Sequence, residues 1–333
     1  MDIKPLLSQI ELELQKQISR LDAPHTKPFH EMLTYHMGWT GEGVGPDAIG
    51  KRIRPMLVLL STAACGALWQ PALPAAAAVE LVHNFSLVHD DIQDNSNKRR
   101  GRPTIWVQWG MPMAINVGDA LFVMSNQAIM DLTENYSPEV IVKAAEILHN
   151  TCLELTCGQF LDMSYEERMD LTLEDYWPMI SGKTAALLSA CCHIGALLGQ
   201  ADDAKQEAYR SFGHYLGLAF QAQDDILGIW GDETLTGKSV ASDLVEGKNS
   251  LPVLAGLSAK GKFAARWKEG NVKQEEVVDL ARLLAAEGGY EMAMDAAKQM
   301  TDLALMSLRE ADPQGEAGEG LFELADKLLK RNQ

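Results

Sequence analysis

The sequence lacks several features that would each indicate a different class of protein. No basic run offsets the formal net charge of −17, which argues against nucleic-acid binding. Residues 1–4 show no basic or apolar region of a secretion signal, and the longest apolar stretches, 56–68 and 184–199, are shorter than the roughly 20 residues that span a bilayer. We therefore expect a cytoplasmic protein with no transmembrane segment and no nucleic-acid partner.

Cysteine is also scarce, and the spacing of the cysteines does not match a metal site. The five cysteines form no C-x-x-C motif and lie in apolar segments. An odd number without paired spacing disfavours both a disulfide framework and a zinc site. We expect buried free thiols in a reducing compartment, at Cys65, Cys152, Cys157, Cys191 and Cys192.

Strand-like alternation of apolar residues is missing as well, whereas helical spacing is common. Apolar residues recur at positions 3, 7, 10, 14 and 18, and long helix-like stretches cover 72–91, 139–163, 173–199 and 204–229. Hydrophobic residues make up 47% of the chain, enough for a large core, and no low-complexity linker divides it. We predict one all-α domain covering residues 1–333.

Aspartates cluster at two places, each inside an apolar stretch. Carboxylates three or four residues apart on a helix share a face, with their Cβ atoms about 5–6 Å apart, and repel each other. Mg²⁺ takes oxygen ligands from one or two carboxylates and completes its octahedron with water and substrate phosphates. The clusters therefore indicate cation sites; the first holds Asp90, Asp91 and Asp94, and the second holds Asp224 and Asp225.

Basic residues follow each cluster. Arg99 and Arg100 follow the first, and Lys238 and Lys248 follow the second. Such cations would face the phosphate charge that a metal does not neutralise. A single D-D-x-x-D string is more often a solvated helix face or a helix cap, but two clusters in apolar stretches with basic followers favour a clamp for a diphosphate.

With these motifs the chain resembles the trans-isoprenyl diphosphate synthases, also called polyprenyl synthetases. Each motif alone is weak evidence, whereas the ordered set is specific. The resemblance implies an all-α bundle of antiparallel helices around a deep central cavity, in a homodimer. The motifs are G-K-R-I-R-P at 50–55, E-L-V-H at 80–83, H-D-D-I-Q-D at 89–94, R-R-G at 99–101, G-D-A-L at 118–121, G-Q at 158–159, K-T at 183–184, F-Q at 220–221 and G-K at 247–248.

The resemblance also implies a reaction. An allylic diphosphate (dimethylallyl, geranyl or farnesyl) ionises, the double bond of isopentenyl diphosphate attacks the carbocation, and loss of a proton leaves a product five carbons longer. Diphosphate leaves readily only when metal ions and cationic donors meet its growing charge, which fits the residue types of the motifs.

The resemblance assigns roles to individual residues. Three Mg²⁺ ions with substrate bound would be held by Asp90, Asp94 and Asp224, with Asp91 and Asp225 supporting them indirectly or through water. The allylic diphosphate would be held by Arg99, Lys183 and Lys238, and isopentenyl diphosphate by Lys51, Arg54, His83 and Arg100. Lys248 would also bind substrate, and Thr184 and Gln221 would turn oxygen dipoles toward the cation. For His83 alone, a satisfied core histidine would be the simpler interpretation.

Two positions depart from the family pattern. Gly228 stands where the second cluster usually ends in aspartate, with Asp232 as the nearby candidate to compensate. We expect Gly228→Asp to be tolerated. The segment 38–50 is longer and richer in glycine than expected before the lysine motif, and we expect it to be flexible.

The length of the product is predicted from Phe85, five residues before Asp90. On a helix this ring lies about a turn below the carboxylates, where the family uses a bulky side chain as a floor. With the small Ser86 beside it, the pattern resembles geranylgeranyl diphosphate synthases, with farnesyl or longer-chain synthases as alternatives. The simpler interpretation is that Phe85 only packs in the core.

Three other functions remain open at this point. A terpene cyclase would lack the set Lys51, Arg54 and Arg100, which is present. A non-catalytic subunit of a heteromeric prenyltransferase would have lost aspartates, and only Gly228 fits that expectation. A head-to-head synthase would show different aspartate spacing.

Overall fold

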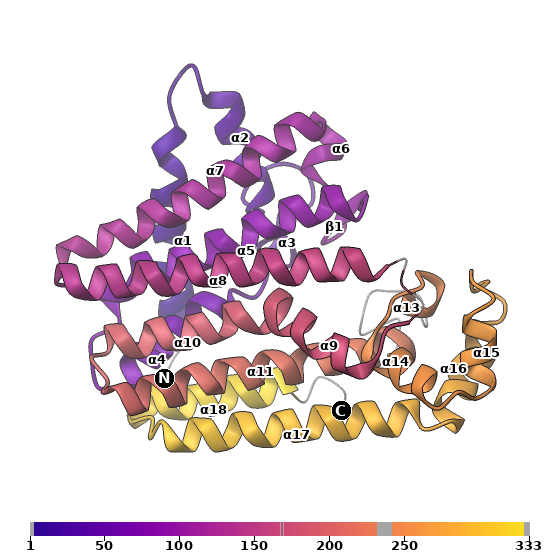
Figure 1. Ribbon diagram of the computed structural model, residues 1–333. Coiled ribbons are helices and arrows are strands. Elements are labelled where there is room, and N and C mark those ends of the chain that lie inside the picture. The colour runs from indigo at the N-terminus through magenta and orange to yellow at the C-terminus, as the bar shows by residue number, and fades with distance from the viewer. Residues whose placement is uncertain (1–2, 167, 169, 232–241, 330–333) are drawn as a thin grey trace. The chain divides into compact units, whose positions relative to one another are not determined.

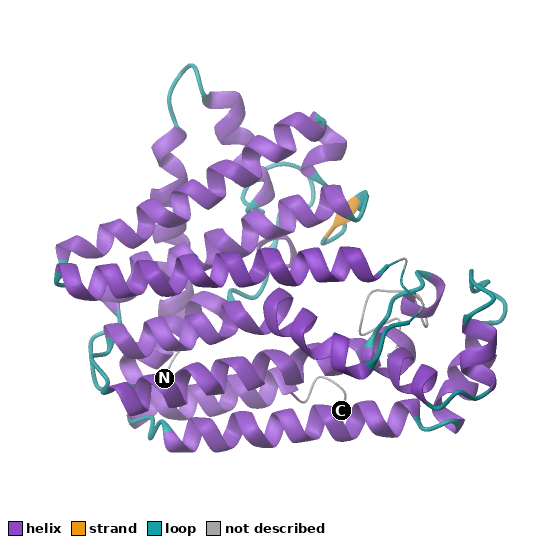
Figure 2. Ribbon diagram, in the orientation of Figure 1, coloured by secondary structure: helices purple, strands orange, loops and turns teal. Residues whose placement is uncertain are grey.

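The computed structural model describes residues 3–166, 168, 170–231 and 242–329 (Figure 1). Most of these residues are helical, and loops join the helices (Figure 2). The strands among them are one antiparallel pair, β1 (Lys98–Arg99) and β2 (Arg102–Pro103). The predicted all-α fold is confirmed.

Two compact units make up the chain, and each is assembled from separate segments. The first contains Met1–His149, Cys191–Gln206 and Pro313–Gly320, and the second contains Asn150–Ala190, Glu207–Asp312 and Leu321–Gln333. Four helices contribute residues to both units: α8 (Pro138–Tyr165), α10 (Ala186–Leu198), α11 (Asp203–Trp230) and α18 (Gly315–Leu329). Since neither unit is one uninterrupted stretch, a single domain over 1–333 stays our prediction.

Helix α5 is the central element of the first unit. It packs along α7 and also against α4 and α1 (Figure 1). Its first turns consist of small buried residues, so neighbouring helices can approach closely. The elements lying wholly within this unit, besides β1 and β2, are α1 (Ile3–Ile18), η1 (Ser19–Leu21), α2 (Lys27–His36), α3 (Pro46–Ile49), α4 (Ile53–Ala64), η2 (Gln70–Ala72), α5 (Leu73–Gln93), α6 (Ile105–Trp109), α7 (Met111–Met130) and η3 (Asp131–Glu134).

In the second unit, α14 packs against α17, and α9 and α11 contribute to the same core. Tyr176, Ile226 and Leu254 are among its buried side chains. The elements lying wholly within this unit are α9 (Leu173–Ile180), the π-helical turn η4 (Ser181–Ala185), α13 (Ser242–Val245), α14 (Leu251–Ser258), α15 (Lys262–Trp267), α16 (Val277–Ala286) and α17 (Gly289–Glu310).

The predicted helices agree closely with the structure. The stretches 72–91, 139–163 and 204–229 correspond to α5, α8 and α11, and 173–199 corresponds to α9, η4 and α10. On α1 the buried stripe is Leu6, Ile10, Leu14 and Ile18, so Leu6 is buried in place of the expected Leu7.

Two helical stretches are longer and more apolar than the sequence analysis expected. Gln70–Gln93 and Leu173–Leu198 are long and apolar enough, by length and composition alone, to cross a membrane. The core helix of a globular protein passes the same test, and 67% and 72% of their most apolar windows are buried inside the protein. These helices therefore give only weak evidence for a membrane span.

All five cysteines are free thiols. Cys152, Cys191 and Cys192 are buried as expected, and Cys65 is half-buried. Cys157 is exposed, which corrects the expectation that every thiol would be buried.

Candidate functional site

The first aspartate cluster lies at the carboxyl end of α5. Asp90 is on the last turn, and Asp94 caps the helix, its backbone N–H donating to the Asp90 carbonyl at 2.8 Å. Carboxylates four residues apart repel each other, and the negative end of the helix dipole adds to that cost. This arrangement fits a divalent cation. Among the described residues, no three His, Cys, Asp or Glu side chains could hold a metal together, so a cation here needs further ligands such as water or phosphate.

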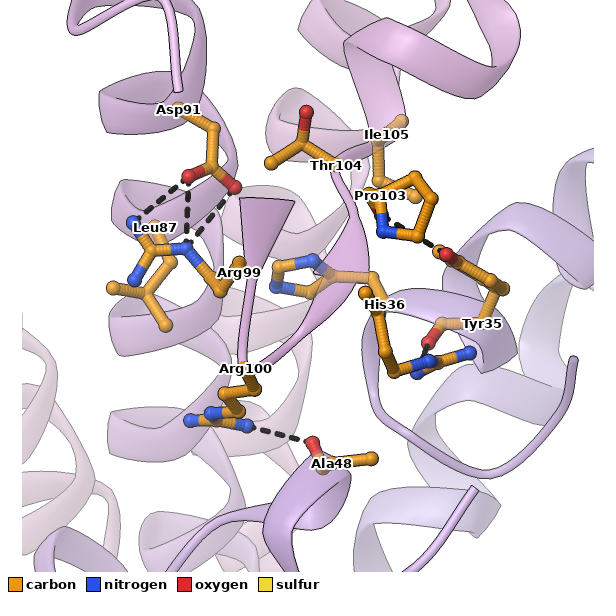
Figure 3. Close-up of a pocket in the computed structure, with 11 residues that line it drawn as sticks. Tyr35, His36, Ala48, Leu87, Asp91, Arg99, Arg100, Pro103, Thr104 and Ile105 are labelled. Carbon is orange, nitrogen blue, oxygen red and sulfur yellow. Dashed lines mark hydrogen bonds and ion pairs between the residues drawn. The ribbon is translucent and has the colours of Figure 1, made fainter. Parts of the chain in front are cut away.

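Asp91 holds Arg99. The Arg99 Nε donates to Oδ1 and Oδ2 of Asp91 at 2.9 and 3.0 Å, and its Nη2 lies 2.9 Å from Oδ1 (Figure 3). Burial raises the pKa of Asp91 to about 6 against the opposing effect of Arg99, and the neighbouring Asp90 and Asp94 raise it further. Because both oxygens of Asp91 are engaged, its carboxylate orients the arginine.

Arg100 occupies the tight turn between β1 and β2. Arg100 and Gly101 have φ values of 51° and 75°, as a two-residue type I′ hairpin turn requires. The Arg100 Nη1 donates to the carbonyls of Ala48 and Ile49, both at 2.9 Å. A Cβ on Gly50 would lie 2.7 Å from the Arg100 guanidinium, which explains why glycine precedes the lysine motif.

Arg102 holds the glycine-rich segment 38–50. Its guanidinium donates to the carbonyls of Tyr35, Thr40 and Glu42 at 2.8, 2.6 and 2.9 Å and lies over the Tyr35 ring. With Arg100 holding Ala48, two arginines of one hairpin fix this segment. These contacts argue against the expected flexibility of the segment, and neither they nor the burial of Arg102 could be inferred from glycine content.

The second basic residue of the lysine motif, Arg52, is structural. It is buried with φ of 49° at the start of α4. It donates from Nε to Glu11 at 2.5 Å and from Nη1 to Glu80 at 2.8 Å. Although burial lowers the pKa of Arg52, Glu80 and Glu11 outweigh that effect and raise it. The ion pairs anchor the segment that carries Lys51 and Arg54.

Arg54 and His83 lie in the same basic region. The Arg54 Nε is buried and has no hydrogen-bond partner in the described part of the chain. Burial lowers the pKa of His83 well below its usual range, and Arg54, Arg100 and Arg99 lower it further. Burial also lowers the pKa values of Arg54 and Arg100. Clustered cations with an orphaned donor fit an anionic ligand, and Lys51 is exposed beside them in sequence.

In the second cluster, Asp225 is the centre of a hydrogen-bond network. Its Oδ2 accepts from the Tyr176 hydroxyl and the Leu251 N–H, and its Oδ1 accepts from Gln221 Nε2, each at 2.8 Å. Burial raises the pKa of Asp225 to about 6, although these donors lower it. Asp224 is less buried. As with Asp91, occupied oxygens favour an orienting role for Asp225.

The same network reaches Thr184. Its hydroxyl donates to Gln221 Oε1 at 2.8 Å, so the Gln221 amide is oriented from both ends. Thr184 lies in η4, and π-helical turns are frequent at functional sites. Gly158 allows α8 to approach this turn, since a Cβ at Gly158 would lie 2.1 Å from the backbone nitrogen of Lys183. The Lys183 ammonium forms an ion pair with Asp162.

Asp243 occupies the space next to Gly228. A Cβ at Gly228 would lie 2.0 Å from the Asp243 Oδ2, and the Asp243 side chain is buried. The structure therefore disfavours the expected tolerance of Gly228→Asp, because the buried Asp243 side chain would have to move. Lys248 lies 2.8 Å from Glu246 and 3.8 Å from Asp243. Lys238 and Asp232 lie outside the described residues.

We expect Gly228→Asp to lower the free energy of unfolding by roughly 1–3 kcal/mol, the usual cost of overpacking, because the new side chain displaces a buried carboxylate. Gly45→Asp is the control, since nothing lies within 4 Å of a Cβ at Gly45 and its backbone is extended. Chemical denaturation of the two variants checks this. Equal stability of both variants and the parent would contradict it.

Phe85 faces α7. Its ring lies 5.1 Å from that of Phe122, between centroids, and 5.7 Å from that of His89, edge to face. His89 in turn requires Gly118, where a Cβ would lie 2.2 Å from the imidazole. The glycine of the G-D-A-L motif thus allows close contact between α5 and α7, and Phe122 packs against Phe85.

Sequence reasoning missed several residues around these sites. Arg102 directly follows R-R-G, and Asp162 follows G-Q by three positions, so their proximity to motifs was an available signal. Tyr176 and Asp243 carried no such signal, because their importance depends on contacts with residues distant in sequence.

Comparison with known proteins gives consistent matches over nearly the whole chain. The family model described as polyprenyl synthetase matches residues 46–284. A geranylgeranyl diphosphate synthase of Mycobacterium tuberculosis is 39% identical over 92% of this chain and 89% of its own. A (2E,6E)-farnesyl diphosphate synthase of Mycobacterium bovis is 39% identical over 96% and 89%, respectively.

A solved structure of a polyprenyl synthetase from Streptomyces coelicolor A3(2) superposes with a TM-score of 0.87 at 36% identity, over 98% of this chain and all of that one. The resemblance seen in the motifs thus extends to overall sequence and fold. This chain belongs to the polyprenyl synthetase family.

Proposed function

We propose that this protein condenses isopentenyl diphosphate head-to-tail with an allylic diphosphate to give a short-chain all-trans product. The observation that carries the proposal is the basic pocket beside the end of α5. There Arg99 is bound to Asp91, which stands between Asp90 and Asp94 in the sequence, and Arg100 lines the same pocket (Figure 3). Carboxylates that call for a cation, set beside guanidinium groups, suit a metal-bound diphosphate.

In this proposal isopentenyl diphosphate is bound by Lys51, Arg54, His83 and Arg100. Support comes from the orphaned Arg54 Nε and from the neutral state that burial imposes on His83. A neutral imidazole still donates one hydrogen bond. An incoming diphosphate would satisfy both donors.

Ionisation of the allylic substrate depends on cations around its leaving group. Magnesium, when bound, would neutralise the charge that develops on the departing diphosphate. The oxygens of Asp90, Asp94 and Asp224 would hold the ions, while Asp91 and Asp225 keep their neighbours oriented. The phosphate oxygens would be bound by Arg99, Lys183, Lys238 and Lys248. To do so, the Lys183 ammonium would leave its ion pair with Asp162 and pair with the substrate instead.

The carbocation would be stabilised by oriented oxygens. Because the Thr184 hydroxyl donates a hydrogen bond to Gln221, the lone pairs of its oxygen point away from Gln221 and would be available to the carbocation. Gln221 is fixed by Asp225, so neither dipole has to reorganise when charge develops.

For the product we propose geranylgeranyl diphosphate, on the basis of Phe85. Farnesyl diphosphate is the second candidate, because the Mycobacterium bovis relative named a farnesyl diphosphate synthase is as similar as the geranylgeranyl one. The test is incubation with labelled isopentenyl diphosphate, each allylic starter and Mg²⁺, followed by sizing of the dephosphorylated products. Absence of elongation with every starter would refute the proposed activity.

Arg100 is expected to serve isopentenyl diphosphate selectively. Arg100→Asn preserves the left-handed turn, since asparagine tolerates it, but removes the cation. Loss of a charge-assisted contact worth roughly 1.5–3 kcal/mol predicts an increase in KM for isopentenyl diphosphate of about 10- to 100-fold. The allylic KM should stay nearly constant, and Lys98→Ala on the same hairpin is the control. Equal increases for both substrates would reject the assignment.

We also propose a homodimer, supported by the exposed face of α7. Met111, Ile115, Val123 and Met130 lie on one side of this helix, and each is more than 40% exposed. Exposed apolar residues on one helix face favour an interaction surface, and here the exposed Asp119 lies among them. Val123→Glu should convert a dimer to a monomer in light scattering, whereas Leu12→Glu, exposed on α1, should not.

The five free thiols favour a cytoplasmic location.

A further inference from the structure

His36 ends α2 and belongs to none of the sequence motifs. It also precedes residues 46–284, which the family model matches. Nevertheless it lines the basic pocket together with Arg99, Arg100 and Thr104, and its imidazole extends into the space beside Arg99 (Figure 3). A titratable group is thus placed among the guanidinium groups by a segment that the motifs do not cover.

The hydrogen bonding of this imidazole is incomplete. Its Nε2 is buried and has no hydrogen-bond partner in the part of the chain that the structure describes. Asn84 on α5 is its polar neighbour and raises the pKa of His36 as a weak hydrogen-bond partner, but neither the His36 Nε2 nor the Asn84 Oδ1 has a partner of normal geometry. A buried polar atom without a partner costs about 1–3 kcal/mol, so its retention needs an explanation.

The charges around the ring indicate what could satisfy it. Burial lowers the pKa of His36 to about 3, and Arg100, Arg99 and Arg52 lower it further. The carboxylate that lines the pocket, Asp91, is already bonded to Arg99. A neutral imidazole donates through one nitrogen, and an electropositive pocket favours an anion with several acceptor oxygens.

We propose that His36 is a substrate-binding residue whose Nε2–H donates to a phosphate oxygen of isopentenyl diphosphate. This inference rests on the proposed function. The isopentenyl substrate is favoured over the allylic one because Arg100, which we assign to isopentenyl diphosphate, lines the same pocket as His36. Arg99, which we assign to the allylic diphosphate, lines it too, but its guanidinium is turned to Asp91.

Three substitutions test the position of the donor. Glutamine places an amide nitrogen near Nε2, asparagine places one near Nδ1, and leucine supplies no donor. We expect His36→Leu and His36→Asn to raise the KM for isopentenyl diphosphate at least tenfold, with the allylic KM and kcat within about twofold of the parent. His36→Gln should restore the KM to within about threefold. His25→Leu, exposed before α2, is the control.

Calorimetry with inorganic diphosphate separates this inference from the proposed activity. If the parent protein elongates no substrate, the proposed function fails, but a weaker Kd for diphosphate in His36→Leu would still support the site. The inference is overturned if His36→Leu leaves both the KM and the Kd unchanged. It is also overturned if the variant lowers the melting temperature and raises both substrate KM values equally, as a purely structural role requires. Should the leucine variant not fold, the difference between glutamine and asparagine decides.

Discussion

Asp90→Asn and Asp224→Asn are each expected to lower kcat by two or more orders of magnitude, about 3 kcal/mol or more in the barrier. Asparagine keeps the size of the side chain but removes the negative charge that a hard cation needs. The fold should survive, since loss of one charge relieves repulsion within each cluster and, at Asp90, next to the negative end of α5. Steady-state kinetics over a range of Mg²⁺ concentrations measures the effect.

The second aspartate of each pair provides the matched comparison. Asp91 and Asp225 have both oxygens engaged by protein donors, so Asp91→Asn and Asp225→Asn should disturb Arg99 and Gln221 rather than remove a ligand. We expect Asp225→Asn to reduce kcat less than Asp224→Asn and to leave the affinity for Mn²⁺, measured with an unreactive diphosphate analogue, nearly unchanged. Normal turnover of Asp90→Asn at saturating Mg²⁺ would reject the metal assignment.

Phe85→Ala is expected to lengthen the product. Removing the ring leaves an apolar void that further isoprene units can fill, and the first condensation should stay intact because the carboxylates are unaffected. The substitution also removes the contacts with Phe122 and His89, and its cost in stability could reach about 3 kcal/mol. Chromatography of the dephosphorylated products gives the length distribution, with the melting temperature recorded alongside.

The structure adds a second ring to this prediction. Since Phe122 on α7 packs against Phe85, elongation in Phe85→Ala should stop at a new limit, and the double variant with Phe122→Ala should exceed it. Phe263→Ala, a buried aromatic in a different core, controls for general loosening. An unchanged distribution from a folded, active Phe85→Ala protein would place the floor elsewhere.

The helices could be predicted from sequence because their signals are local. Apolar spacing identified α5, α8 and α11 to within two residues at their ends, although α8 and α11 contain glycine. The aspartate clusters were equally visible, since both members of each pair are adjacent in sequence. The division of labour within each pair was not visible, because it depends on partners such as Arg99 and Tyr176.

Errors arose where one residue meets another distant in sequence. Gly228 was interpreted as a missing carboxylate, but the space belongs to Asp243 on α13. Segment 38–50 was expected to be flexible because of its glycines, but carbonyl contacts from Arg100 and Arg102 determine its order. Composition indicates which conformations a segment can adopt, and tertiary contacts select one of them.

The left-handed turn at Arg100 places opposing requirements on one residue. Backbone geometry there favours asparagine followed by glycine, and arginine costs of order 1 kcal/mol or more in such a conformation. The guanidinium offsets that cost, because its hydrogen bonds to the carbonyls of Ala48 and Ile49 are charge-assisted and contribute roughly 1.5–3 kcal/mol each. The cation that we assign to the substrate therefore also holds the polypeptide together. A laboratory selection for thermal stability alone would retain this arginine, although asparagine suits the turn better.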